Sequence, residues 1–260
     1  MNRPTVAIAL RLRLMAAVSG AVGLIAVQIA VGALFPAIGH TIGKLSIPKG
    51  VAQLLGGADY DTITGWFRSE IASIYGPLVI GALAITGAAA TTAGEEEDRI
   101  LALVLAHPIS RWRLVASKGV AIGGVVLVIA LGAWVGMIAG VAIGGGGISF
   151  GHVTAFALHL MFFGLAAGAV ALAIGAGTGR RSLATGVAAG VGITSWLIYG
   201  FAPLVGALNW LKYLSFFYYY ADHDPLTRGV GVADIVVLAV VTAVITALAM
   251  VGIERRDLRG

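Results

Sequence analysis

The sequence predicts an all-α integral membrane protein with six transmembrane helices. Composition is the first reason, because 59% of the 260 residues are hydrophobic and only 11% are charged, whereas a soluble domain has about 25% charged residues. A larger core does not explain this deficit, since a soluble chain must still cover its surface with polar groups. The second reason is that six separate stretches are apolar for about 20 residues, the length that a helix needs to cross a bilayer.

The predicted spans belong to a single transmembrane domain over residues 1–260. The fourth and fifth are kept apart by Arg180 and Arg181, because each arginine would cost about 2.5–3.5 kcal/mol at mid-bilayer. The first is kept as a permanent span, because it is longer than the apolar core of about 7–15 residues in a signal peptide. The six spans are 14–35, 71–93, 119–143, 153–176, 182–204 and 235–253.

The distribution of basic residues predicts that both termini are cytoplasmic (N-in, C-in). With that orientation, 12 of the 17 Lys and Arg residues lie inside and five lie outside, in agreement with the positive-inside rule. The charges stand at the ends of spans rather than on one soluble face, so they indicate topology and contact with membrane lipid, and no nucleic-acid partner is expected.

Two outer segments, 36–70 and 206–231, are too long for simple turns. Residues 51–55 of the first predict a short amphipathic helix at the interface. The second is dense in aromatic residues, which favour an interfacial belt or, alternatively, an external gate or short re-entrant helix. Its cluster Asp222-His223-Asp224, just before Pro225, predicts a solvated turn rather than a metal or acid/base site. The gate candidates are Tyr213, Phe216, Phe217 and Tyr218.

The segment 94–118, between the second and third spans, is the most informative part of the chain. Four consecutive acids, Glu95 to Asp98, precede an apolar run that ends before Pro108. Asp98 is expected to cap a helix that begins at Arg99, with the other acids near its positive end, and Ser110 is expected to cap a second short helix. The segment therefore predicts a short helix across the cytoplasmic surface, charged at both ends, that docks a soluble partner.

This segment resembles the type-2 class of ABC transporter permeases, whose pattern is Glu-x-x-Gly-Thr-Leu-x-Leu-Leu-Leu-x-x-Pro-Val-Ser-Arg followed by a lysine. Glu96 matches the glutamate, and Lys118 matches the lysine. Arg99-Ile100 replaces the Gly-Thr pair. Further matches are the apolar Leu101, Leu103, Val104 and Leu105, the turn Pro108-Ile109-Ser110-Arg111, the outer segment 211–218 and the tail 253–258.

The resemblance implies the permease subunit of an ATP-driven exporter. Two permeases, either two copies of this chain or a copy and a homologue, would pair above two separate ABC ATPase subunits. Arg180 and Arg181 would form a second, smaller cytoplasmic contact, and residues 214–224 would lie at the outer mouth. The coupling helix that the resemblance implies includes Glu95, Glu96, Glu97, Asp98, Arg99, Leu103, His107, Pro108, Ser110, Arg111 and Arg113.

The chain itself is not expected to be an enzyme or to hold a cofactor. It lacks the Gly-x-x-x-x-Gly-Lys-Ser/Thr loop, so ATP and Mg²⁺ would be bound by the partner ATPase. Cysteine is absent, and no histidine pair has metal-ligand spacing. His159, inside the fourth span, is expected to pack through a hydrogen bond, with a functional role as the alternative. No metal site is therefore predicted.

Two other functions are open at this stage. An ion-coupled secondary transporter would need acids at the span centres, which the sequence lacks. A non-transporting membrane anchor or sensor for a cytoplasmic ATPase fits the docking segment equally well. The scarcity of charge in the spans favours a hydrophobic or amphipathic substrate, such as a drug, a lipid or a lipid-linked glycan. The glycine rows at 132, 136 and 140, at 164 and 168, and at 186 and 190 predict close helix packing within one chain, with a dimer seam or a sliding surface as the alternative.

Overall fold

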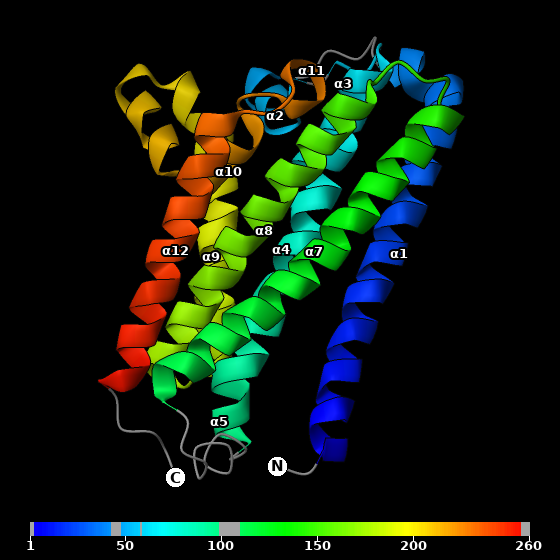
Figure 1. Ribbon diagram of the computed structural model, residues 1–260. Helices are drawn as coiled ribbons and strands as arrows, with labels where there is room; N and C mark the ends of the chain where they lie inside the picture. The colour runs from blue at the N-terminus through cyan, green and yellow to red at the C-terminus, as the bar shows by residue number, and fades with distance from the viewer. Residues whose placement is uncertain (1–2, 43–47, 58, 99–109, 256–260) are drawn as a thin grey trace.

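The computed structural model describes residues 3–42, 48–57, 59–98 and 110–255, which form a bundle of long helices (Figure 1). No strand occurs among these residues. The helices are α1 (Arg3–Ile42), α2 (Lys49–Leu54), α3 (Ile63–Phe67), η1 (Arg68–Tyr75), α4 (Gly76–Ala89), η2 (Ala90–Gly94), α5 (Glu95–Glu97), α7 (Arg111–Ile143), α8 (Phe150–Thr178), α9 (Arg181–Phe201), η3 (Ala202–Leu204), η4 (Gly206–Leu214), α10 (Phe216–Ala221), α11 (Pro225–Arg228) and α12 (Val232–Glu254).

The bundle has two chemically different ends (Figure 1). One end, here called the termini end, carries the start of α1, the end of α12, α5 and the turn between α8 and α9. The opposite end, called the loop end, carries the short helices α2, α3, η3, η4, α10 and α11. The long helices run between these two ends.

Six helical segments of the described chain are long and apolar enough to cross a membrane, which confirms the predicted fold class. They are Leu14–Gly39, Ile63–Ala89, Arg111–Ile143, Phe150–Thr178, Arg181–Leu204 and Val232–Glu254. The second begins eight residues before the predicted start at 71. Its first turns contain the charged residues Arg68 and Glu70, so a search for apolar residues alone places its start too late. The Thr62 hydroxyl caps this start by accepting a hydrogen bond of 3.1 Å from the Gly65 N–H.

The third helix, α7, also starts earlier than predicted, at Arg111 rather than at residue 119. Its 33 residues span about 50 Å at about 1.5 Å per residue, whereas the hydrocarbon core is about 30 Å thick. Helix α7 is therefore longer than a bilayer crossing requires, and its first two turns carry the basic residues that precede the predicted span.

The second membrane helix contains a π-helix, η1, over eight residues. The N–H of Gly76 reaches back five residues to the Ile71 carbonyl. Pro77, the next residue, has no N–H to give to the preceding turn. π-Helical turns inside α-helices occur frequently at functional sites, and this one carries Arg68 at the loop end.

Helix α8 is the centre of the bundle, where it packs against α4, α7, α9 and α12. In the most apolar 18-residue stretch of α8, 67% of the residues are buried inside the protein, whereas the corresponding share in α12 is 11%. The exposed row Val232, Val236, Val240, Val244 and Leu248 lies along α12 at helical spacing. Helix α12 therefore presents most of its apolar surface to lipid or to another subunit.

Glycine allows α1 to approach α7 closely. A Cβ at Gly132 would lie 2.6 Å from the Ala21 Cβ, and a Cβ at Gly140 would overlap the Gln28 carbonyl. Gly164 is equally close to Ile80, at 2.7 Å. Packing within one chain thus accounts for the rows in α7 and α8. Gly186 on α9 is different, since no atom of the described chain lies within 4 Å of its Cβ position, and the same holds for Gly190.

Candidate functional site at the two ends of the bundle

The acids of the predicted docking segment end the second membrane helix. Glu95–Glu97 form α5, which continues directly from η2, and Asp98 is its C-cap. The helix that was expected to begin at Arg99 lies outside the described residues, so its capping by Asp98 stays a prediction. Carboxylates at a helix C-terminus meet the negative end of the helix dipole. They therefore need cationic or N–H partners from other elements.

Glu95 finds such a partner on α7. Both of its carboxylate oxygens lie 2.6 Å from the Lys118 Nζ, and the two side chains are only 14% and 16% exposed. Hydrogen bonds between charged groups are about twice as strong as those between neutral groups. This ion pair fixes the end of the second membrane helix to the start of the third.

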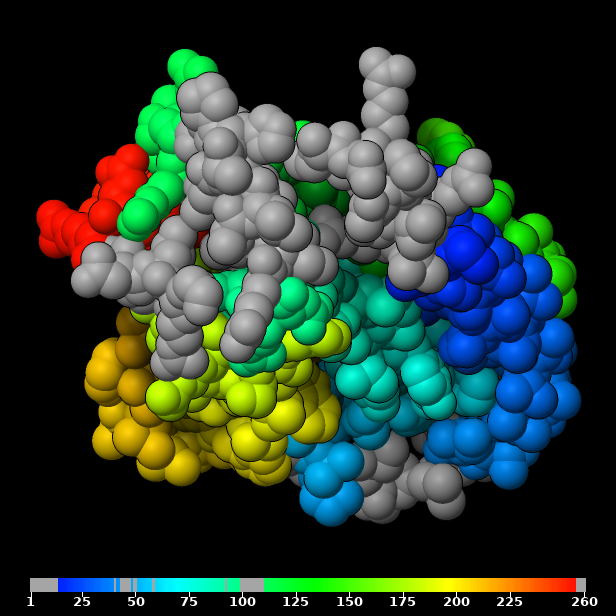
Figure 2. Space-filling view, turned by 90° about the horizontal axis from the view of Figure 1, so that it is seen from below, coloured from blue at the N-terminus to red at the C-terminus, as the bar shows by residue number. Residues whose placement is uncertain are grey.

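Glu97 finds its partner on α9. Its Oε1 accepts a hydrogen bond of 2.9 Å from the backbone N–H of Arg181, the first residue of α9. The carboxylate thus caps the positive end of a helix more than 80 residues away in sequence. In the view of the termini end, the acidic end of α5 lies beside the α8–α9 turn (Figure 2). The two predicted cytoplasmic contacts therefore meet in one surface.

The α8–α9 turn is as tight as the sequence predicted. Gly179 adopts the left-handed conformation (φ 63°, ψ 22°) and its N–H donates to the Gly175 carbonyl at 2.9 Å. Arg180 follows in an extended conformation, and its N–H donates to the Thr178 hydroxyl at 3.3 Å. Arg180 and Arg181 are both exposed at this turn, as expected for a turn that faces water.

The residues that follow the docking segment open α7 itself. Ser110 occupies the N-cap position, but its side chain makes no capping hydrogen bond. Arg111 and Arg113 lie in the first turn of α7 rather than in a separate short helix, which corrects the expectation for this stretch. Arg111 donates to the Ile253 carbonyl at 3.4 Å, and Arg113 lies over the Trp112 ring at 5.4 Å. Arg99, Leu103, His107 and Pro108 lie outside the described residues, so their part in docking stays a prediction.

At the loop end, the aromatic segment divides into η4, which has no buried residue, and the short helix α10, which buries two aromatic side chains. In α10, Phe217 and Tyr220 are 2% and 1% exposed. The centroid of the Phe217 ring lies 5.8 Å from that of Phe163 on α8 and 5.4 Å from that of Tyr199 on α9. Phe216 and Tyr218 are partly buried, whereas Tyr213 is exposed. Among the four gate candidates, Phe217 is therefore the one whose side chain is buried.

Hydrogen bonds hold α10 in this position. Ser215 donates to the Ser195 carbonyl of α9 at 2.7 Å, and its hydroxyl accepts from the Tyr218 N–H. Tyr220 donates its hydroxyl proton to the Ala72 carbonyl at 2.7 Å. Burial raises the pKa of Tyr220 well above its usual value. Burial, with the Asp222 charge as a second cause, raises the pKa of Tyr218 to about 12. Both phenols thus stay protonated at neutral pH.

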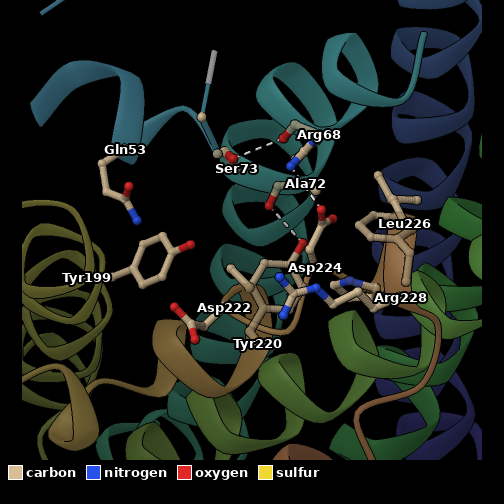
Figure 3. Close-up of a pocket in the computed structure, with 15 residues that line it drawn as sticks. Gln53, Arg68, Ala72, Ser73, Tyr199, Tyr220, Asp222, Asp224, Leu226 and Arg228 are labelled. Atoms are coloured by element: carbon tan, nitrogen blue, oxygen red, sulfur yellow. Dashed lines mark hydrogen bonds and ion pairs between the residues drawn. The ribbon is translucent and has the colours of Figure 1, made fainter. Parts of the chain in front are cut away.

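An ion pair that the sequence did not reveal also closes this end. Arg68 Nη1 lies 2.9 Å from Asp224 Oδ2 (Figure 3), and the Thr227 hydroxyl donates to the same oxygen at 2.6 Å. Asp224 has a positive φ of 54°, which a short polar side chain tolerates best. Its side chain is only 17% exposed, so the expected solvated turn is wrong for Asp224. The pair joins the second membrane helix to the segment before the sixth.

His159 is hydrogen bonded, as the sequence predicted. Its Nδ1 lies 2.9 Å from the Ala155 carbonyl within α8. Its ring also stacks on His223, with centroids 6.3 Å apart and planes at 4°, and His223 Nδ1 lies 3.9 Å from Asp234 of α12. No group of three or more metal-binding side chains occurs in the described part of the chain. This stack is one more contact that holds the loop end to α8 and α12.

The comparison with known families assigns the fold to a transport class. Residues 3–253 match the family described as the multidrug efflux system permease Rv1217c, C-terminal domain. The match agrees with the resemblance to ABC permeases in the docking segment, and it covers all six membrane helices. No curated protein matches the chain.

Proposed function

Because the chain belongs to the family of the multidrug efflux system permease Rv1217c, C-terminal domain, an ABC-type permease family, we propose that it is the membrane-spanning subunit of an ATP-driven exporter. The chain is a multi-pass membrane protein of an efflux permease family. Separate ABC ATPase subunits would bind ATP and Mg²⁺ and dock at the termini end. The single observation that carries the proposal is the joining of the docking acids to the α8–α9 turn through Glu97 and Arg181.

The proposal places the termini end in the cytoplasm. Most of the Lys and Arg residues lie at that end of the spans, and this bias sets orientation in membranes. The loop end, with its aromatic helix α10, would then face the outside. An ATPase reaching the termini end meets the acids of α5, the start of α7 and the exposed Arg180 and Arg181 together.

The α9 helix gives a physical route for coupling. Its first residue is capped by Glu97 at the termini end, and its last turns contact α10 through Ser195 and Tyr199 at the loop end. A helix of 21 residues transmits an axial shift over about 30 Å. Displacement of the docking surface by ATP-driven closure would therefore move the wall against which Phe217 packs, and would open the outer mouth.

A second permease half is part of the proposal. The family takes its name from the C-terminal domain of a permease, so that relative has a further portion. Here the partner would be a second copy of this chain or a homologue. The exposed apolar rows of α9 and α12 suit lipid, the second half or a hydrophobic or amphipathic substrate between them.

Co-purification with the ATPase tests the docking surface. We expect that Arg111→Glu, or deletion of residues 108–113, leaves the protein inserted in the membrane but releases the ATPase. Lys212→Gln at the loop end is the matched control and should retain the ATPase. Recovery of an intact complex from both docking variants would contradict the proposal.

Transport in vesicles separates the exporter from the alternatives. The exporter moves a fluorescent amphipathic dye only with ATP, whereas an ion-coupled carrier moves it with an ion gradient alone. An anchor or sensor retains the ATPase and moves no dye under either condition.

A further inference from the structure

A polar cavity of about 280 Å³ opens among the helices of the loop end (Figure 3). Its lining comes from α2 and the turn after it, η1, α8, α9 and the segment from α10 to α11. The volume lies just below the range of about 300 Å³ upwards that is usual for drug-sized ligands, so the cavity suits a polar head group rather than a whole drug. The polar side chains that face it are Gln53, Arg68, Tyr199, Asp222, Asp224 and Arg228.

The charges in the lining balance, with two arginines and two aspartates. Arg68 and Asp224 already form an ion pair at 2.9 Å. Arg68 nevertheless offers five donors, of which the pair with Asp224 engages Nη1, and its side chain is 26% exposed. The guanidinium is therefore only partly satisfied where it borders the cavity, and an incoming anion would gain a donor there without breaking the pair.

The other two charges lie within the cavity lining without an ion pair in the described part of the chain. The Asp222 carboxylate is on the side of Tyr199, and the guanidinium of Arg228 is on the side of Asp224 (Figure 3). Both residues are exposed, so neither charge is held by burial. One part of the cavity thus presents a carboxylate with an aromatic ring, and another presents guanidinium groups.

Each part matches a different charge on a ligand. A carboxylate beside a phenol ring suits an ammonium group, through an ion pair and a cation–π contact. Guanidinium groups suit a phosphate or a carboxylate, which they bind through paired hydrogen bonds. A purely anionic ligand would meet Asp222 unpaired, and a purely cationic ligand would meet Arg228 unpaired, so both are disfavoured.

We propose that this cavity binds a zwitterionic head group, with its ammonium on Asp222 and Tyr199 and its phosphate or carboxylate on Arg228 and Arg68. The head group has two possible sources, a phospholipid of the adjacent leaflet or a small soluble zwitterion, and both share this chemistry. Binding beside the Arg68–Asp224 pair would make the closure of the loop end sensitive to the ligand. The inference concerns binding alone, and so does not depend on the proposed export activity.

Titration of the purified full-length protein with soluble phosphoethanolamine tests the inference. In nanodiscs that contain only phosphatidylglycerol, we expect saturable binding by calorimetry. Inorganic phosphate alone and ethanolamine alone should bind at least about tenfold more weakly, because each leaves one charge of the cavity without a partner.

Charge-removing variants assign the two parts of the cavity. Asp222→Asn should weaken phosphoethanolamine binding roughly 10- to 100-fold and should strengthen phosphate binding, because it removes the carboxylate that an anion leaves unpaired, whereas Arg228→Gln should weaken both. Lys212→Gln, at the same end but outside the lining, is the control. Because Asp222 and Arg228 are exposed, both variants should fold, which gel filtration and circular dichroism would check.

Nanodiscs of a second lipid composition distinguish the two possible sources of the head group. If a phospholipid head group fills the cavity, nanodiscs with phosphatidylethanolamine should lower the apparent affinity for phosphoethanolamine at least tenfold; if the source is soluble, the affinity should stay unchanged. Either result supports a zwitterion site. Absence of phosphoethanolamine binding at millimolar concentration, or equal affinity in Asp222→Asn, Arg228→Gln and Lys212→Gln, would overturn it. Such a failure leaves ATPase docking and ATP-driven dye transport, measured separately, untouched.

Discussion

The two ends of this bundle are held together by different forces. At the termini end, carboxylates of α5 bind a lysine of α7 and the first N–H of α9. At the loop end, the rings of Phe163, Tyr199 and Phe217 pack inside the bundle, and the Arg68–Asp224 ion pair lies beside them at the margin. Polar contacts can exchange partners when a soluble protein docks, whereas a packed aromatic helix is either in place or displaced. This difference is what the proposal requires of a docking surface at one end and a closure at the other.

The largest expected effect concerns the aromatic closure. Phe217→Ala removes a buried ring and should lower the free energy of unfolding by about 3–5 kcal/mol. Tyr213→Ala, on an exposed side chain of the same segment, should change it by less than about 0.5 kcal/mol. Thermal unfolding in detergent measures both. Equal effects would show that the aromatic segment is a surface belt after all.

The ion pairs at the two ends should differ in strength. The Glu95–Lys118 pair has two contacts at 2.6 Å and is the more buried, whereas Arg68–Asp224 has one contact at 2.9 Å and an arginine that is 26% exposed. Double-mutant cycles with Glu95→Gln and Lys118→Met, and with Asp224→Asn and Arg68→Met, should give coupling energies of about 3 and about 1 kcal/mol. A reversed order would mean that the loop end, not the termini end, depends on charge.

The smallest expected effect on stability concerns the cap of α9. Glu97→Ala should cost about 1 kcal/mol but should reduce ATP-driven transport far more than ATPase binding, because it cuts the connection to α9. Glu254→Ala, which removes an exposed acid at the end of α12 outside the predicted docking residues, is the control. If both variants transport equally well, α9 is not the route of coupling.

The fold could be predicted because the number of spans and the tight turn each depend on a short stretch of sequence. Apolar runs of about 20 residues fix the number of spans, and Gly179 with two arginines fixes the α8–α9 turn. The helix ends were harder, because α7 runs two turns beyond the apolar run, and α3 begins among polar residues that a hydropathy count rejects. Glu97 capping Arg181 joins residues 84 positions apart, and no local pattern encodes that contact.

At the loop end, even fewer of the contacts could be predicted from the sequence. The gate candidates were found as a group because aromatic residues are conspicuous, but only packing distinguishes buried Phe217 from exposed Tyr213. The pairing of Arg68 with Asp224 was missed because Arg68 is a single charge in a segment expected to lie outside the membrane, and Asp224 was expected to face water. The signal that was available was an acid directly before Pro225, with a lone arginine at the start of the second membrane helix.

The central claim is that the end bearing α5 faces the cytosol and receives the ATPase. The chain has no cysteine, so Asp98→Cys creates a single reporter at the exposed end of α5, and Lys212→Cys creates one at the loop end. With a membrane-impermeant maleimide, we expect intact cells to label position 212 and not position 98, inverted vesicles to label position 98, and bound ATPase to protect it. Labelling of position 98 from outside intact cells would contradict the account.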